Sequence, residues 1–87
     1  MLSLEDCIAL SGLTEDEVLA IAQHQHIPEI AAAELGNYLS RTADGRLAIK
    51  SMIRDDIQAA AAHGDLERVL ALKLVLRNYV SERRGLD

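Results

Sequence analysis

The residues with the greatest potential for chemistry are two histidines one residue apart, in the stretch AQHQHIPEIAAAEL. They are His24 and His26, in a chain that has three histidines. Such a pair shares a face only on an extended backbone, because on a helix the two side chains point about 200° apart. A closed zinc site would also need ligands from Cys7, Glu29 or His63, and no known spacing motif brings these residues together. We interpret the pair as a helix end, and metal binding by the three histidines stays open.

A cysteine and paired carboxylates offer two further kinds of catalytic chemistry. Cys7 lies near a predicted helix start, where thiols are sometimes activated, but the neighbouring Glu5 and Asp6 disfavour a thiolate. Adjacent acids such as Asp55 and Asp56 diverge on a helix and are typical of a solvated face. The sequence has no phosphate-binding loop, G-x-G-x-x-G motif or serine-centred elbow. We predict no catalytic residue, cofactor or metal, and a metal- or thiol-dependent enzyme is the second alternative.

The elements that would position such residues belong to one small domain. The chain has 87 residues, 49% of them hydrophobic, and lacks Phe and Trp, so aliphatic side chains must fill the core. This length predicts a single domain over residues 1–87, whose core a second subunit could complete. The single cysteine excludes an internal disulfide, and no apolar stretch approaches the roughly 20 residues that cross a bilayer. No basic region precedes the first apolar segment, so we expect a cytoplasmic protein with no membrane contact.

Capping residues mark the first helices. Ser3 and Gly12 delimit a short helix. Thr14 and Glu17 form a capping box at the start of the next helix. Pro28 disfavours helical backbone at the preceding residue but fits the first turn of a new helix. The second helix should therefore stop near the two histidines, and a third should begin at Pro28.

The chain between the third and fourth helices has two interpretations. Apolar residues recur at three-to-four spacing over residues 28–41 and residues 46–62, which predicts two helices. Residues 42–45, TADG, would then form a turn. Asp44 followed by Gly45 also suits the two-residue turn of a β-hairpin. We favour the helices, because the residues on either side do not alternate between apolar and polar.

The last predicted helix runs over residues 66–84 and is apolar nearly all round. Asp65 caps it, and arginines in its last turn complement the helix dipole. We therefore predict an all-α, orthogonal or bundle-like domain of four to five helices with a long C-terminal helix. That helix is either the central one of the bundle or meets its copy across a twofold axis. We favour a homodimer, with interface residues Leu66, Val69, Leu70, Leu72, Leu74, Val75, Leu76, Tyr79 and Val80.

Residues 2–22, LSLEDCIALSGLTEDEVLAIA, carry a short helix, a small residue plus glycine, and a capped second helix. This stretch resembles a helix-turn-helix, especially the opening unit of MerR-type regulators. The resemblance implies a DNA-binding or transcription-associated protein, the first alternative function, in which Arg77, Arg83 and Arg84 would contact phosphate. The residues that carry it are Leu10, Ser11, Gly12, Leu13, Thr14 and Val18.

The charge distribution favours a different function. Residues 1–40 contain seven acidic residues and no Lys or Arg, and the remainder contains nine basic and seven acidic residues. Proteins that bind nucleic acid concentrate positive charge where they touch the backbone. We therefore predict a non-enzymatic protein-interaction or assembly module, whose acidic surface suits a protein partner with a basic surface. The predicted acidic surface comprises Glu5, Asp6, Glu15, Asp16 and Glu17.

Overall fold

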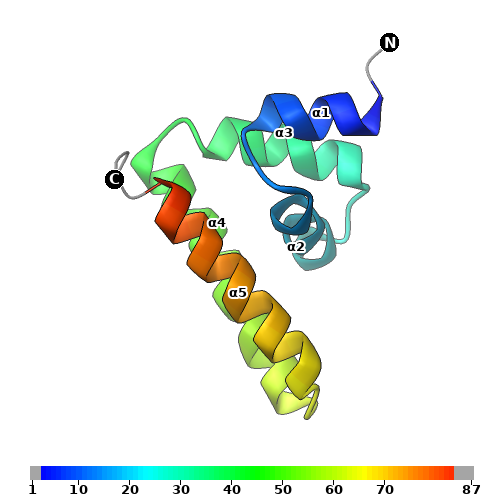
Figure 1. The fold of residues 1–87 in the computed structure, drawn as a ribbon, viewed down its shortest axis with the longest axis vertical. Coiled ribbons are helices and arrows are strands. Elements are labelled where there is room, and N and C mark those ends of the chain that lie inside the picture. The colour runs from blue at the N-terminus through cyan, green and yellow to red at the C-terminus, as the bar shows by residue number, and fades with distance from the viewer. Residues whose placement is uncertain (1–2, 84–87) are drawn as a thin grey trace.

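The computed structural model describes the backbone of residues 3–83 and the side chains of residues 3–81 (Figure 1). These residues form five α-helices and no strand, which confirms the predicted all-α class. No described helix is both long enough and apolar enough to cross a membrane. The helices are α1 (Leu4–Ser11), α2 (Glu15–Gln25), α3 (Glu29–Leu39), α4 (Ala43–Ala62) and α5 (Leu66–Arg83).

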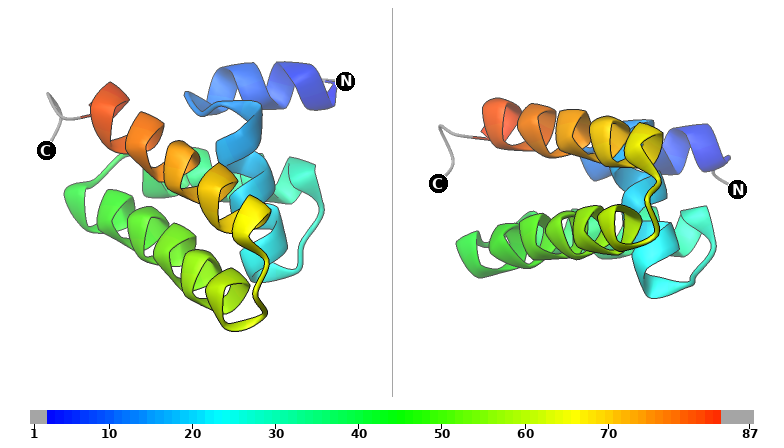
Figure 2. Two further views of the ribbon diagram at one scale, coloured as in Figure 1. Left: turned by 60° about the horizontal axis from the view of Figure 1, so that its bottom comes forward. Right: turned by 90° about the horizontal axis from the view of Figure 1, so that it is seen from below.

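The helices pack as two pairs with α2 between them. Helices α1 and α3 lie side by side, and α4 and α5 form an antiparallel pair (Figures 1 and 2). Helix α2 packs against α3, α4 and α5. Helix α5 packs mainly on α4 and to a smaller extent on α2. The C-terminal helix is therefore long, with 18 residues, but lies at the edge of the domain.

The predicted caps are present at the first two helices. Asp6 N donates to Ser3 Oγ (3.1 Å), and Gly12 ends α1 in the left-handed conformation with φ of 76°. Glu17 N donates to Thr14 Oγ1 (3.2 Å), and Thr14 N donates to Glu17 Oε1 (2.9 Å). Helix α2 ends at Gln25. The starts of α1 and α2 thus follow from local hydrogen bonds between residues close together in the sequence.

The two histidines lie at the predicted helix end. His26 is the C-cap of α2 in the left-handed conformation, with φ of 55°, and Ile27 N donates to Ala22 O (3.1 Å). Histidine is one of the few residues other than glycine that adopts this conformation with some frequency. Pro28 follows as the N-cap of α3 in extended backbone, so α3 begins at Glu29, one residue after the predicted start at Pro28.

The predicted turn at residues 42–45 is wrong, and so is the alternative hairpin. Helix α4 already begins at Ala43, because Thr42 is its N-cap and Gly45 N donates to Thr42 Oγ1 (3.0 Å). The chain reverses earlier, where Ser40 N donates to Gly36 O (2.9 Å) and ends α3. The residues that resemble a turn thus form the cap and first turn of a helix, in which Thr42 satisfies a free amide.

The hydrophobic core surrounds α2. Val18 and Ile21 of α2 have no exposed surface, and neither have Ile49 and Ile53 of α4 or Tyr79 of α5. Small residues of α3 complete this cluster and allow α3 to approach α2 closely. Because the central helix is α2, its burial decides which of its residues remain available to a partner.

Replacement of Thr14 by alanine should lower the free energy of unfolding by about 1 kcal/mol, since it removes the acceptor for Glu17 N. Thr14→Ser keeps the hydroxyl and should stay close to the unmodified protein. The measurement is the urea midpoint of both variants by circular dichroism. Equal midpoints for the two variants would contradict a stabilising role for this cap.

Candidate functional site

The most prominent surface feature is a row of three leucines on α5. Leu66, Leu70 and Leu74 follow one another at four-residue spacing and are 70%, 68% and 56% exposed. Residues spaced by four lie on the same face of a helix. We call these three leucines the α5 outer face. Single exposed leucines are ordinary on protein surfaces, whereas an apolar row is typical of an interaction site.

The opposite face of α5 belongs to the core. Val69, Leu72 and Tyr79 are 8%, 4% and 0% exposed. The edge position of α5 explains this division, because α4 and α2 cover one side of the helix and no described helix covers the other. The structure thus divides the nine predicted interface residues into three groups. Val69, Leu72 and Tyr79 are buried, Val75 and Leu76 are partly buried, and Leu66, Leu70, Leu74 and Val80 are exposed.

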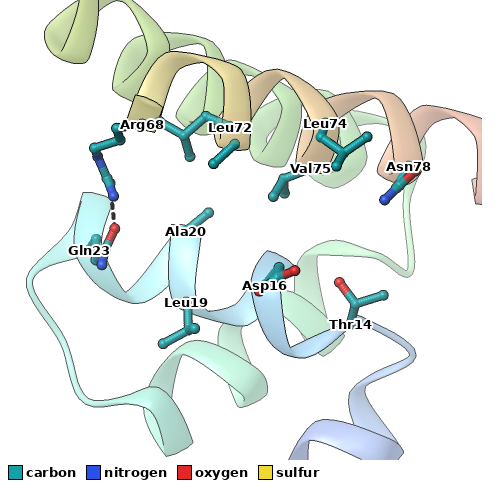
Figure 3. A pocket seen from close by; sticks show the side chains of 11 residues that line it. Thr14, Asp16, Leu19, Ala20, Gln23, Arg68, Leu72, Leu74, Val75 and Asn78 are labelled. Atoms are coloured by element: carbon teal, nitrogen blue, oxygen red, sulfur yellow. Dashed lines mark hydrogen bonds between the residues drawn. The ribbon is translucent and has the colours of Figure 1, made fainter. Parts of the chain in front are cut away.

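A cleft between α2 and α5 adjoins the α5 outer face (Figure 3). It has a volume of about 300 Å³, at the lower end of the range of small-molecule sites. Leu74, Asp16 and Asn78 are among the residues that line the cleft. At one end, the Arg68 side chain donates a hydrogen bond to Gln23 Oε1. The cleft therefore extends the accessible apolar surface from α5 towards α2.

A groove between α4 and α5 contains three cationic side chains. Arg54 comes from α4, Lys73 and Arg77 come from α5, and all three are exposed. We call it the α4–α5 groove; its volume is about 600 Å³ and its lining residues are Arg54, Lys73, Leu76, Arg77, Val80 and Ser81. No sequence motif predicts this groove, and among its cations only Arg77 was a predicted site residue, as a phosphate contact. The four-residue spacing of Lys73 and Arg77 could have indicated that two cations share a face of the last helix. Arg54 lies near them only because α4 packs on α5.

The predicted acidic surface is present at four of its five positions. Glu5 and Asp6 of α1 and Glu15 and Asp16 of α2 are exposed. Glu17 differs, because its side chain is 0% exposed and caps the backbone of Thr14. The capping box alone does not bury this carboxylate, because Asp6 makes the same contact with Ser3 and is exposed; the packing around the start of α2 covers Glu17.

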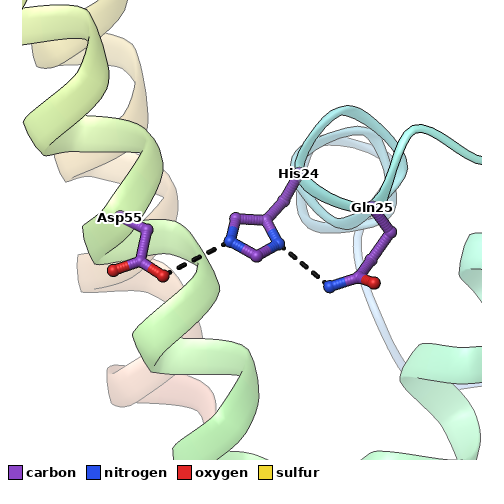
Figure 4. Close-up of polar contacts among 3 residues, drawn as sticks. All are labelled: His24, Gln25 and Asp55. Atoms are coloured by element: carbon purple, nitrogen blue, oxygen red, sulfur yellow. Dashed lines mark hydrogen bonds and ion pairs between the residues drawn. The ribbon is translucent and has the colours of Figure 1, made fainter.

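The histidines make polar contacts between helices and at helix ends. His24 Nε2 lies 3.4 Å from Asp55 Oδ2, and Gln25 Nε2 lies 3.0 Å from His24 Nδ1 (Figure 4). His26 caps α2, and His63 caps α4. Cys7 is half-buried and packs against the core. Within the part of the chain that the structure describes, no three His, Cys, Asp or Glu side chains are arranged to hold a metal ion.

One carboxylate next to His24 and Asp55 has a perturbed acidity. Burial raises the pKa of Asp56 above its ordinary value, and the charges of His24 and Arg68 act in the opposite direction. These three residues come from α4, α2 and α5. The polar groups near His24 therefore lie at a junction of three helices.

The segment that resembles a helix-turn-helix consists of two helices joined by a short turn. Helix α1 ends at Ser11 and α2 begins at Glu15. The exposed residues at the start of α2 are Glu15 and Asp16, and the side chains of Val18 and Ile21 are fully buried. Among the arginines of the DNA-binding alternative, Arg77 lies in the α4–α5 groove. Arg84 and the side chain of Arg83 lie outside the described residues.

Comparisons with known proteins give no relative: no protein-family model, curated protein or solved structure matches this chain.

Proposed function

We propose that this chain is a non-enzymatic assembly module that forms a homodimer through the α5 outer face. The observation that carries the proposal is the row of Leu66, Leu70 and Leu74, more than half exposed on an edge helix whose opposite face is already in the core. A helix with two apolar faces requires cover on both. A second copy supplies that cover with an identical surface.

A twofold axis suits this row of leucines. In an antiparallel pair of α5 helices, Leu70 lies next to its own copy, and Leu66 lies next to Leu74 of the second chain. Such an isologous contact is closed and gives a dimer without further growth.

The free energy gained by burying the leucines in this contact is similar in size to the cost of bringing two chains together. Burial of a leucine contributes about 1.5–3 kcal/mol, and roughly 1–2 kcal/mol for a side chain that is already partly covered. Six leucines, three from each copy, then contribute on the order of 10 kcal/mol, comparable with the roughly 4–15 kcal/mol cost of association. The leucines thus roughly balance the cost of association, and the cleft beside Leu74 adds the further contact area from which the net affinity comes.

The geometry of α2 gives less support to the DNA-binding alternative. A recognition helix presents several side chains to the major groove. Helix α2 packs against three other helices, and the exposed residues at its start are acidic. Close to phosphates these carboxylates oppose binding.

Leu70→Glu should convert the protein to a monomer without unfolding it, because Leu70 is 68% exposed. A charge at the centre of an apolar contact stays unpaired and is costly to bury. Light scattering should give a mass near the 9.5 kDa of one chain, and circular dichroism should show a helical spectrum like that of the unmodified protein, since a surface substitution changes the free energy of unfolding by only about 0.5 kcal/mol.

Gln58→Glu is the matched control, because it places the same charge at an exposed position on α4. This variant should keep the mass of the unmodified protein. A Leu70→Glu variant that also keeps that mass would contradict dimerisation through the α5 outer face.

A further inference from the structure

The α4–α5 groove has the composition of a site for an acidic helix. Among the residues whose side chains the structure describes, the charged ones that line it are all basic, namely Arg54, Lys73 and Arg77, and the apolar side chains between them are Leu76 and Val80. We propose that this groove, which adjoins the α5 outer face along α5, binds an acidic amphipathic helix of another protein.

Within the described residues, the three cations of the groove have no ion-pair partner. Other arginines do have structural roles, since Arg46 donates to Ser40 O (3.0 Å) and Arg68 donates to Gln23. The cations of the groove therefore remain available to a partner.

The spacing of the groove residues on α5 fits a helical partner. Lys73, Leu76, Arg77 and Val80 occupy positions i, i+3, i+4 and i+7 on one face of the helix. Two cations four residues apart are separated by about 6 Å along the axis, which equals the separation of two acids at the same spacing on a partner helix. The apolar residues receive the partner's apolar stripe, as in other complexes of a helix in a groove.

The same residues fit nucleic acid less well. Three cations give a small electrostatic gain with a phosphate backbone, while Leu76 and Val80 have no apolar counterpart there. The chain as a whole carries a charge of −5, and its first forty residues contain seven acids and no Lys or Arg.

The test uses the full chain and a labelled peptide of about 18 residues, with leucines at i, i+3, i+4 and i+7 and glutamates at the flanking positions. Fluorescence anisotropy at low salt should show saturable binding that weakens as salt is added. The same peptide with glutamine in place of glutamate should bind at least about tenfold more weakly, because the cations then have no charged partner.

The charge-reversed variant Lys73→Glu together with Arg77→Glu should lose binding of the acidic peptide. Arg41→Glu, at an exposed position outside the groove, should retain it. Circular dichroism should give helical spectra for both variants, which checks that they are folded. Equal affinity for the glutamate and glutamine peptides, unchanged binding by the double variant, or tighter binding of random duplex DNA than of the acidic peptide would each overturn the proposal.

Discussion

Gly45→Ala is expected to lower the free energy of unfolding by about 3–5 kcal/mol, a large effect for the addition of one methyl group. A Cβ atom at Gly45 would lie 1.9 Å from the backbone oxygen of Leu39 and 2.6 Å from its carbonyl carbon. Backbone atoms have no alternative rotamer, so either α4 must move away from the end of α3 or its first turn must unwind. Chemical denaturation followed by circular dichroism measures the loss.

Gly36→Ala adds the same methyl group at a position where the nearest atoms belong to side chains instead of the backbone. A Cβ at Gly36 would lie 2.2 Å from Cδ1 of Leu13, which is the end of a side chain that can change its rotamer. We therefore expect a smaller loss, about 1–3 kcal/mol. A Gly45→Ala variant as stable as the unmodified protein would contradict the close contact of α3 with the start of α4.

Tyr79→Ala is the second change with a large expected effect. Tyr79 is the largest side chain with no exposed surface, and it anchors α5 in the core. Removal of a buried aromatic ring leaves a cavity and costs about 3–5 kcal/mol. In a domain of this size such a loss is a large part of the total stability, so we expect a protein that is partly unfolded at 37 °C.

The other tyrosine of the chain supplies the control. Tyr38 is 68% exposed on α3, so Tyr38→Ala should change the free energy of unfolding by less than about 0.5 kcal/mol. Thermal melts of the two variants compare the same substitution in two environments. Similar melting temperatures for both variants would contradict the packing of α5 against α2 and α4.

Helix boundaries set by local hydrogen bonds could be predicted from the sequence. Thr14 and Glu17 need only each other and the intervening turn to form a capping box. The start of α4 was not found, because Thr42 caps it with a single hydrogen bond and the following Asp44 and Gly45 also suit a turn. The fit of Gly45 against Leu39 selects the helix, and that tertiary contact is not visible in the sequence.

The candidate surfaces could be predicted only in part. The sequence shows that α5 is apolar nearly all round, but which of its apolar residues face solvent depends on where α2 and α4 lie. Leu70 and Leu72 are alike in the sequence, yet one is 68% exposed and the other 4%. The α4–α5 groove likewise requires Arg54 to lie near Lys73, and only the antiparallel packing of the two helices places them together.

Sedimentation equilibrium of the unmodified protein over a range of micromolar concentrations is the most direct test of the proposed assembly. We expect a mass close to twice the 9.5 kDa of one chain, and added salt should not lower it, since the contact is apolar. At the lowest concentrations the mass should fall towards that of one chain. A mass of one chain at every concentration would contradict a homodimer formed through Leu66, Leu70 and Leu74.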